Sequence, residues 1–342
     1  MLRERLIGGR RAGAFTLQWH LTNACGLDCR HCYDRSTRPQ LSLEAGRAVL
    51  DDLAAFTRRH DVRGHVTFTG GDPFLHPAFW ELYGDATRRQ LRTAILGNPV
   101  APGVLDRLIA IQDPAFYQVS LEGMPAANDS VRGEGHFART VAFLEAARAR
   151  HVTTHVMLTL TRENVEEVLP LAARLRGLTR RLSFNRLARI GGGAALALPD
   201  RGELAPFLDR YVAAARHDPL LGLKDNLLGL ARLRAGLRPG GGCTGHGCGA
   251  AFNFVALLPD GEAHACRKFP SPIGRLPDGS LDQAWRSEAA RRYRAGSEGC
   301  RGCALRPACG GCMAVTYGEG LDPLVARDPQ CDGPVVGARR SA

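Results

Sequence analysis

The sequence of 342 residues predicts an α/β protein, a partial barrel of βα units followed by a small cysteine-rich domain. Two observations predict this fold class. Short apolar segments alternate with amphipathic helical patterns over the first two-thirds of the chain, which indicates βαβ units and a parallel sheet. The eleven cysteines fall into a front group of three and a rear group of eight beyond residue 240, with none between Cys32 and Cys243. The rear group therefore marks a second module.

Six segments rich in β-branched or apolar residues are expected to be buried strands. They are Thr16–Leu21, His65–Thr69, Thr93–Leu96, Phe116–Leu121, Thr153–Leu160 and Arg181–Leu187. Six βα units are too few to close an eight-stranded barrel, but they can form an open, TIM-like (β/α)6 barrel. Its active site is then expected at the carboxyl ends of the strands.

Helical patterns separate these strands. The first follows Ser42, whose hydroxyl is a suitable N-cap, and carries an apolar stripe from Leu43 to Phe56. The others span approximately Pro77–Gln90, Pro102–Ile111, Phe137–Arg150, Val165–Arg176 and Arg201–Ala215. The first five lie between two predicted strands, as crossover helices should, and Arg201–Ala215 follows the sixth strand.

Beyond residue 238 the sequence is rich in cysteine and no longer alternates strand and helix patterns regularly. The segment "AAFNFVALLPDGEAHACRKF" predicts a hairpin whose second strand ends at Cys266, and a helix is expected from about Leu281 to Arg294. We therefore divide the chain into an N-terminal segment (1–13), a barrel (14–237), a cysteine-rich domain (238–335) and a tail (336–342).

The composition of the chain limits which binding partners and which cellular compartment are expected. The net charge is +11, and all but two of the basic residues, Lys224 and Lys268, are arginines scattered along the chain. No basic run is interleaved with aromatic residues, so nucleic-acid binding is not expected. No apolar run is long enough to span a bilayer and no signal peptide is present, so we expect a soluble, cytoplasmic protein without a membrane partner. In a reducing compartment the cysteines favour metal binding over disulfides.

The front cysteines stand in the segment "NACGLDCRHCYD", as Cys25-x3-Cys29-x2-Cys32. A closed structural zinc site takes four ligands, so a zinc site here needs a further ligand from His31, His20 or a distant cysteine. The alternative is a [4Fe–4S] cluster held by three thiolates, which leaves one iron with an open coordination position. An open iron can bind and activate a substrate or cosubstrate.

The triad after the first strand, together with "TFTGGDP" after the second and "SLEG" after the fourth, resembles the radical S-adenosylmethionine (SAM) superfamily. The resemblance implies that the triad cluster binds SAM and that reductive cleavage of SAM yields a 5′-deoxyadenosyl radical. His31 takes the place of the aromatic residue that usually precedes the last cysteine. Gly70, Gly71, Asp72 and Pro73 correspond to a motif at the methionine end of SAM, with Asp72 where glutamate is commoner.

The same resemblance implies further cofactor-binding residues. Ser120 and Glu122 correspond to positions near the SAM ribose. Asn164 and Arg186 correspond to pocket positions, although a role as solvated surface residues is an equal alternative.

The rear cysteines, seen alone, suit a zinc ribbon. With Cys248-x12-Gly261-x4-Cys266 in front of them, the pattern resembles the SPASM domain of peptide-modifying radical SAM enzymes, although its last two gaps are two and eighteen residues rather than three and seventeen. The resemblance implies two closed auxiliary [4Fe–4S] clusters suited to electron transfer. The nearer would be held by Cys243, Cys248, Cys266 and Cys312, and the farther by Cys300, Cys303, Cys309 and Cys331.

This resemblance implies a maturase of ribosomally made peptides (RiPPs) that installs a thioether or carbon–carbon crosslink, an oxidation or an epimerisation. Its partners would be a precursor peptide and an electron donor such as ferredoxin or flavodoxin. No leader-binding module is recognisable, so the precursor is expected to be held by the barrel mouth, the SPASM domain or a separate leader-binding protein. The segments "LQWHLTNAC" and "HACRKFPSPIG" are similar to maturases of the selenobiotic-peptide group.

Three alternatives stay open: a SPASM enzyme acting on a small molecule, a non-catalytic iron–sulfur carrier, and a zinc-rich binding protein. No catalytic acid or base is identifiable from the sequence. Asp260, Glu262 and His264 are expected to be turn or surface residues. Arg267 and Lys268 either bind a carboxylate, tune a cluster next to Cys266, or form a solvated pair.

Overall fold

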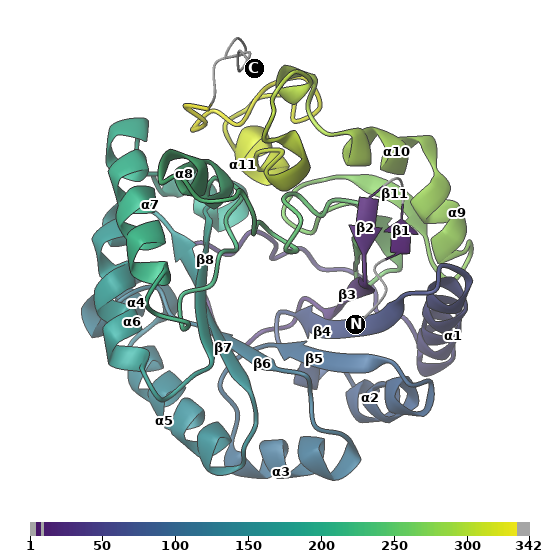
Figure 1. Cartoon of the computed structure of the whole chain (residues 1–342). Coiled ribbons are helices and arrows are strands. Elements are labelled where there is room, and N and C mark those ends of the chain that lie inside the picture. The colour runs from purple at the N-terminus through teal and green to yellow at the C-terminus, as the bar shows by residue number, and fades with distance from the viewer. Residues whose placement is uncertain (1–4, 8–9, 334–342) are drawn as a thin grey trace.

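The computed structural model describes residues 5–7 and 10–333. All six predicted strands are present, with ends within two residues of the predicted ones. They run parallel in chain order within one curved sheet (Figure 1). They are β3 (Ala14–Thr22), β4 (Arg63–Gly70), β5 (Arg92–Leu96), β6 (Tyr117–Ser120), β7 (Thr154–Leu160) and β8 (Arg181–Arg186).

The predicted crossover helices cover the outer face of this sheet (Figure 1). They are α1 (Leu43–Arg59), α2 (Phe79–Arg88), α3 (Pro102–Ile111), α5 (His136–Ala149), α6 (Val168–Leu175) and α7 (Arg201–Ala215). The Ser42 hydroxyl accepts a hydrogen bond from the amide of Ala45 at 3.2 Å, which confirms the predicted cap of α1. The predicted start of α6 is wrong, because residues Arg162–Glu167 form a separate 3-10 helix, η2.

The cysteine-rich region extends the barrel sheet. The predicted hairpin is confirmed as β9 (Phe254–Leu257) and β10 (Glu262–His264), and β11 (Pro272–Arg275) pairs with β10. Strand β9 lies parallel to β3, so the sheet order is β11-β10-β9-β3-β4-β5-β6-β7-β8. The hairpin thereby pairs with the edge of β3 that the six-stranded arrangement leaves open. The division at residue 238 stays a prediction.

The single helix predicted from Leu281 to Arg294 is wrong. Ser287 has an extended conformation (φ −56°, ψ 156°) and separates α9 (Leu281–Arg286) from α10 (Glu288–Ala295). Its hydroxyl accepts a hydrogen bond from the amide of Ala290 and so caps α10. A serine at this place therefore ends one helix and begins the next.

Several short elements were not predicted. They are the antiparallel pair β1 (Arg5–Ile7) and β2 (Arg10–Ala12), the helices α4 (Pro125–Arg132), α8 (Leu228–Arg234) and α11 (Met313–Gly318), and the 3-10 turns η1 (Pro73–Leu75), η3 (Gly191–Ala195), η4 (Glu298–Cys300) and η5 (Arg306–Ala308). The predicted tail, 336–342, lies outside the described residues. In the described part of the chain, no helix has the length and apolarity needed to cross a membrane.

Candidate active site

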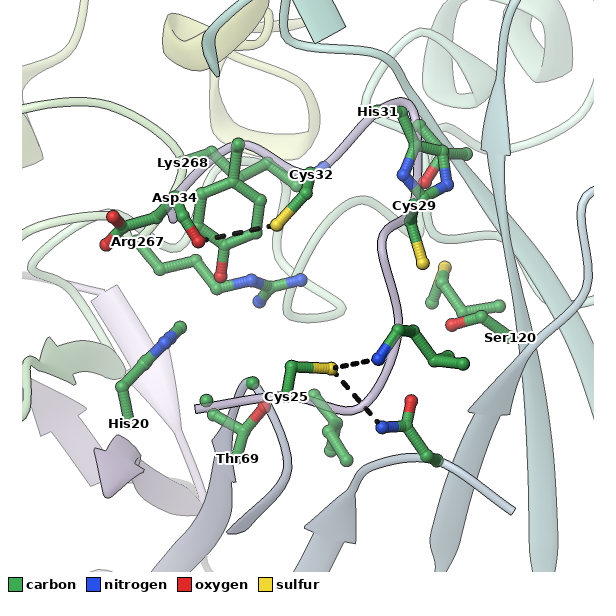
Figure 2. A pocket seen from close by; sticks show the side chains of 18 of the residues that line it. His20, Cys25, Cys29, His31, Cys32, Asp34, Thr69, Ser120, Arg267 and Lys268 are labelled. Atoms are coloured by element: carbon green, nitrogen blue, oxygen red, sulfur yellow. Dashed lines mark hydrogen bonds between the residues drawn. The ribbon is translucent and has the colours of Figure 1, made fainter. Parts of the chain in front are cut away.

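A cavity of about 390 Å³ opens at the carboxyl ends of the barrel strands. Figure 2 shows the three front cysteines in it, with His20 of β3, Thr69 of β4 and Ser120 of β6 around them. This is the end of a parallel barrel at which active sites are found, because the loops after the strands converge there.

The Gly-Gly-Asp-Pro motif holds the start of the cysteine loop. The amide of Gly71 donates to the carbonyl of Thr22 and that of Asp72 to the carbonyl of Ala24, each at 2.8 Å. Gly70 has φ +136°, and a side chain at either glycine would collide with these same carbonyl oxygens. Glycine is thus required here for the close approach of two backbones.

A second glycine segment packs against the other end of the loop. The amide of Gly192 in η3 donates to the carbonyl of Cys32 at 2.9 Å. A side chain at Gly191, whose φ is +56°, would meet the backbone of Cys32 and Tyr33. The role of the run "GGGAA" was not predicted, although three consecutive glycines are a signal for such a contact.

Two of the three triad sulfurs, those of Cys25 and Cys29, have hydrogen-bond donors near them, and Figure 2 shows the two donors of Cys25. The sulfur of Cys25 accepts from the amide of Leu27 at 3.4 Å and from the side chain of Asn98 at 3.5 Å. The guanidinium of Arg132 lies 3.6 Å from the sulfur of Cys29. Burial raises the pKa of the Cys29 thiol, and the charge of Arg132 opposes that effect. The thiol of Cys32 instead donates to the carbonyl of Asp34 at 3.3 Å. Three thiols facing one cavity, two of them with N–H donors, fit a cluster held by three thiolates.

Glu122 lies behind the cavity wall and is fully buried. Its carboxylate accepts from Arg132 Nε at 2.8 Å and from the amide of Thr159 at 2.7 Å, and it lies 3.0 Å from His31 Nε2. Burial alone would raise the pKa of Glu122, but Arg132 and His31 lower it to about 2. Glu122 therefore positions Arg132 against Cys29. Arg132 was not predicted as a site residue.

Asn164 and Arg186 are 3% and 1% exposed, so the alternative that they are solvated surface residues is wrong. The side chain of Asn164 caps η2 and donates to the carbonyl of Glu122 at 3.0 Å. Arg186 lies between Asp225 and Asp328. Neither Asn164 nor Arg186 lines the large cavity.

The structure therefore divides the predicted cofactor-binding residues into two groups. His31, Gly70, Gly71 and Ser120 line the cavity, whereas Asp72, Pro73, Glu122, Asn164 and Arg186 do not. The carboxylate of Asp72 caps η1 by accepting from the amide of Phe74 at 3.1 Å.

The rear cysteines gather around two further cavities, in the two sets that were predicted. One, of about 50 Å³, is lined by Cys243, Cys248, Cys266 and Cys312. The other, of about 20 Å³, is lined by Cys300, Cys303, Cys309 and Cys331. All eleven cysteines are free thiols, and burial raises the pKa of Cys309 and Cys312 to about 12. Four thiols around one cavity fit a four-thiolate cluster in each case. Among residues 5–7 and 10–333, no three His, Cys, Asp or Glu side chains are placed to hold a single metal ion.

The charged residues of the rear hairpin form hydrogen bonds with other parts of the chain. Asp260 and Glu262 accept from Arg38 at 2.7 and 3.3 Å, so they connect the hairpin to the segment after the front cysteines. The expected surface position is wrong for His264, which is buried and bonded to Glu262. Arg267 and Lys268 are partly buried and line both the large cavity and the nearer cysteine cavity. Their place at both cavities favours a role at the clusters over that of a solvated pair.

Comparisons with known proteins agree with this geometry. The family model described as the radical SAM superfamily matches residues 19–175, and the SPASM model, an iron–sulfur cluster-binding domain, matches residues 248–313. The chain is similar to the mycofactocin maturase MftC of Mycobacterium ulcerans, with 33% identity over 92% of this chain and 87% of that protein. It is also similar to an AdoMet-dependent heme synthase of Nitratidesulfovibrio vulgaris, with 25% identity over 92% and 91% of the two chains.

Solved structures share the fold. The crystal structure of Streptococcus suis SuiB superposes with a TM-score of 0.72 at 16% identity, over 95% of this chain and 78% of that one. The structure of anSMEcpe with bound AdoMet and a peptide has a TM-score of 0.71 at 14% identity, over 92% and 93%. The relatives named here are not selenobiotic-peptide maturases, so that subgroup stays a prediction. The chain belongs to the radical SAM superfamily with a SPASM domain, and it is an enzyme that uses a SAM-binding [4Fe–4S] cluster together with auxiliary clusters.

Proposed function

We propose that the protein matures a peptide: it reductively cleaves SAM to a 5′-deoxyadenosyl radical and abstracts hydrogen from a ribosomally made precursor. The observation that carries the proposal is that Cys25, Cys29 and Cys32 are the only cysteines lining the cavity at the strand ends, within the described residues. Three thiolates leave one iron open for SAM. The peptide substrate is supported by the similarity to mycofactocin maturases over nine-tenths of the chain.

In this proposal the residues around the cavity have distinct tasks. The triad holds the SAM cluster, and the two rear sets of four cysteines hold the auxiliary clusters. Gly70, Gly71, His31 and Ser120 face SAM, since they line the same cavity as the triad. Bound SAM and its cluster supply the radical. Arg132 stabilises the thiolate of Cys29, and the backbones of Gly71 and Gly192 hold the loop at its two ends.

Partners and modification type belong to the same proposal. A ferredoxin or flavodoxin would deliver the electron that cleaves SAM. A separate leader-binding protein that holds the precursor peptide is compatible with this proposal. The modification would be a crosslink, an oxidation or an epimerisation. A second candidate is a small-molecule substrate, favoured by the similarity to proteins named AdoMet-dependent heme synthases over 92% of the chain.

The proposal is tested with anaerobically purified protein, reconstituted with iron and sulfide, reduced with dithionite and given SAM. Wild-type protein should form 5′-deoxyadenosine, and the Cys25/Cys29/Cys32→Ala variant should form none while keeping about eight irons per chain. Zinc in place of iron, or iron without SAM cleavage, would refute the assignment.

The substrate class needs a second measurement. Peptides encoded beside the gene, synthesised with deuterium at carbon, are added to the reduced enzyme with SAM. Transfer of deuterium into 5′-deoxyadenosine is expected from a true precursor. Transfer from a deuterated small molecule, with none from any peptide, would favour the second candidate instead.

A further inference from the structure

The two lysines of the chain lie at one cavity. Lysine and arginine together number 45, yet only Lys224 and Lys268 are lysines. Both line the nearer cysteine cavity, together with a single arginine, Arg267. Lysine presents a compact ammonium group, whereas arginine presents a broad planar fork. The placement sets two ammonium groups and one guanidinium group at the wall of this cavity.

Neither ammonium group has a carboxylate partner among the described residues. The one acidic side chain that lines this cavity is Asp225, and its carboxylate is bound to Arg186 at 3.0 Å. The third cation, Arg267, donates to the amide oxygen of Gln18 at 2.7 Å. Partly buried cations without a counter-ion are costly, so the cavity favours an anionic occupant.

The cysteine sulfurs are the groups on which these charges act. Lys268 interacts electrostatically with the thiols of Cys312, Cys243 and Cys266, and Lys224 interacts with that of Cys243. A [4Fe–4S] cluster with four thiolates carries two negative charges when oxidised and three when reduced. The two ammonium groups and Arg267 together match the charge of the reduced cluster, so their field favours the uptake of a further electron.

We propose that Lys224 and Lys268 compensate the charge of the nearer auxiliary cluster and raise its reduction potential. The proposal rests on the assignment of Cys243, Cys248, Cys266 and Cys312 to that cluster under the proposed function. Lys268 lines the large cavity as well, so this compensating charge lies between the two sites. The cavity of the farther set is lined instead by Arg306 and Arg327, so of the two auxiliary clusters the lysines act on the nearer one.

The test uses the full chain with the front triad replaced by alanine, so that only the two auxiliary clusters remain. The variants are Lys224→Gln, Lys268→Gln, their combination, and the corresponding double arginine variant. The control is Arg174→Gln, which removes an exposed charge on α6 that lines none of the three cysteine cavities. Iron content and redox titrations followed by electron paramagnetic resonance are measured without substrate.

Each glutamine substitution should lower the midpoint potential of one cluster, the double substitution should lower it further, and the second cluster should not shift. The double arginine variant should stay close to wild type. Potentials that do not move, or that move equally in both clusters or in Arg174→Gln, would overturn the proposal.

Loss of the nearer cluster is also informative. If the double glutamine variant loses about four irons and the double arginine variant keeps them, charge is what holds the cluster. If both lose them, space rather than charge is decisive and the proposal fails. Absence of iron from the rear cysteines of the parent protein would instead refute the cluster assignment within the proposed function.

Discussion

The guanidinium of Arg186 on β8 donates two hydrogen bonds to the carboxylate of Asp328, at 2.9 and 2.6 Å. The two residues are 142 positions apart in the chain and both are buried. Arg186 also binds Asp225, and Asp328 accepts from the amide of Cys312 at 2.9 Å. One buried arginine thus connects the last barrel strand to both the segment before α8 and the C-terminal cysteine loop.

Arg186→Met should be strongly destabilising, because it leaves two carboxylates buried without a cation. The free energy of unfolding should fall by about 3–5 kcal/mol, as for other buried ion pairs broken on one side. Denaturant unfolding measures this. The control is Arg189→Met, whose partly exposed pair with Glu319 at 3.4 Å should contribute no more than about 1 kcal/mol. A loss equal to that of the control would contradict the structural role of Arg186.

Acid should destabilise the protein partly through Glu122. Its pKa in the folded protein is lowered from 4.5 to about 2. A lowered pKa contributes stability that is fully present above the pKa of the unfolded chain and is lost as the pH falls through the folded value. The loss should therefore fall between about pH 4.5 and about pH 2, and should reach on the order of 3 kcal/mol.

Unfolding of wild type and Glu122→Gln, compared at pH 7, 4.5 and 3 in the cluster-free protein, measures this contribution. The difference in stability between the two proteins should shrink as the pH falls. A constant difference would show that Glu122 does not titrate in this range.

Gly71→Ala should disrupt the front loop and leave the rear of the molecule intact. The added methyl group collides with the carbonyl oxygen of Ala24, which lies next to Cys25. Iron should fall by about four atoms per chain and SAM cleavage should stop. Gly103→Ala is the matched control, because its methyl group meets no atom within 4 Å and alanine favours helix α3. Full iron content in Gly71→Ala would refute this reading of the motif.

Arg132→Gln should slow SAM cleavage, because it removes the cation 3.6 Å from the sulfur of Cys29. A charge-assisted hydrogen bond of about 1.5–3 kcal/mol corresponds to a loss of at least about tenfold in rate. The exposed Arg139→Gln serves as control. The readouts are 5′-deoxyadenosine formation and the potential of the triad cluster, which should fall.

The double variant Glu122→Gln/Arg132→Gln separates charge from folding. It removes the buried pair on both sides, so it should be more stable than Arg132→Gln alone. Its triad potential should stay low. Recovery of the wild-type potential would show that Arg132 acts only through stability.

Local sequence patterns were sufficient to predict most strands and helices of the barrel. Strands such as β7 and helices such as α3 were predictable because apolar periodicity and capping residues act within a few neighbours. The triad was predictable because its three ligands lie within eight residues. The break at Ser287 was missed, since a single capping serine leaves the helical periodicity around it unchanged.

The alternation of strands and helices, the position of the triad after the first strand and the chemistry of the eleven thiols follow from the amino-acid sequence alone. Only the tertiary structure decided that β9 continues the barrel sheet, that Glu122 holds Arg132 rather than lining the cavity, and that both lysines meet at one set of cysteines. The physical reason is that the effect of a buried charge depends on the groups that face it. Those groups come from segments far apart in the chain, and a local sequence pattern does not show which of these segments meet.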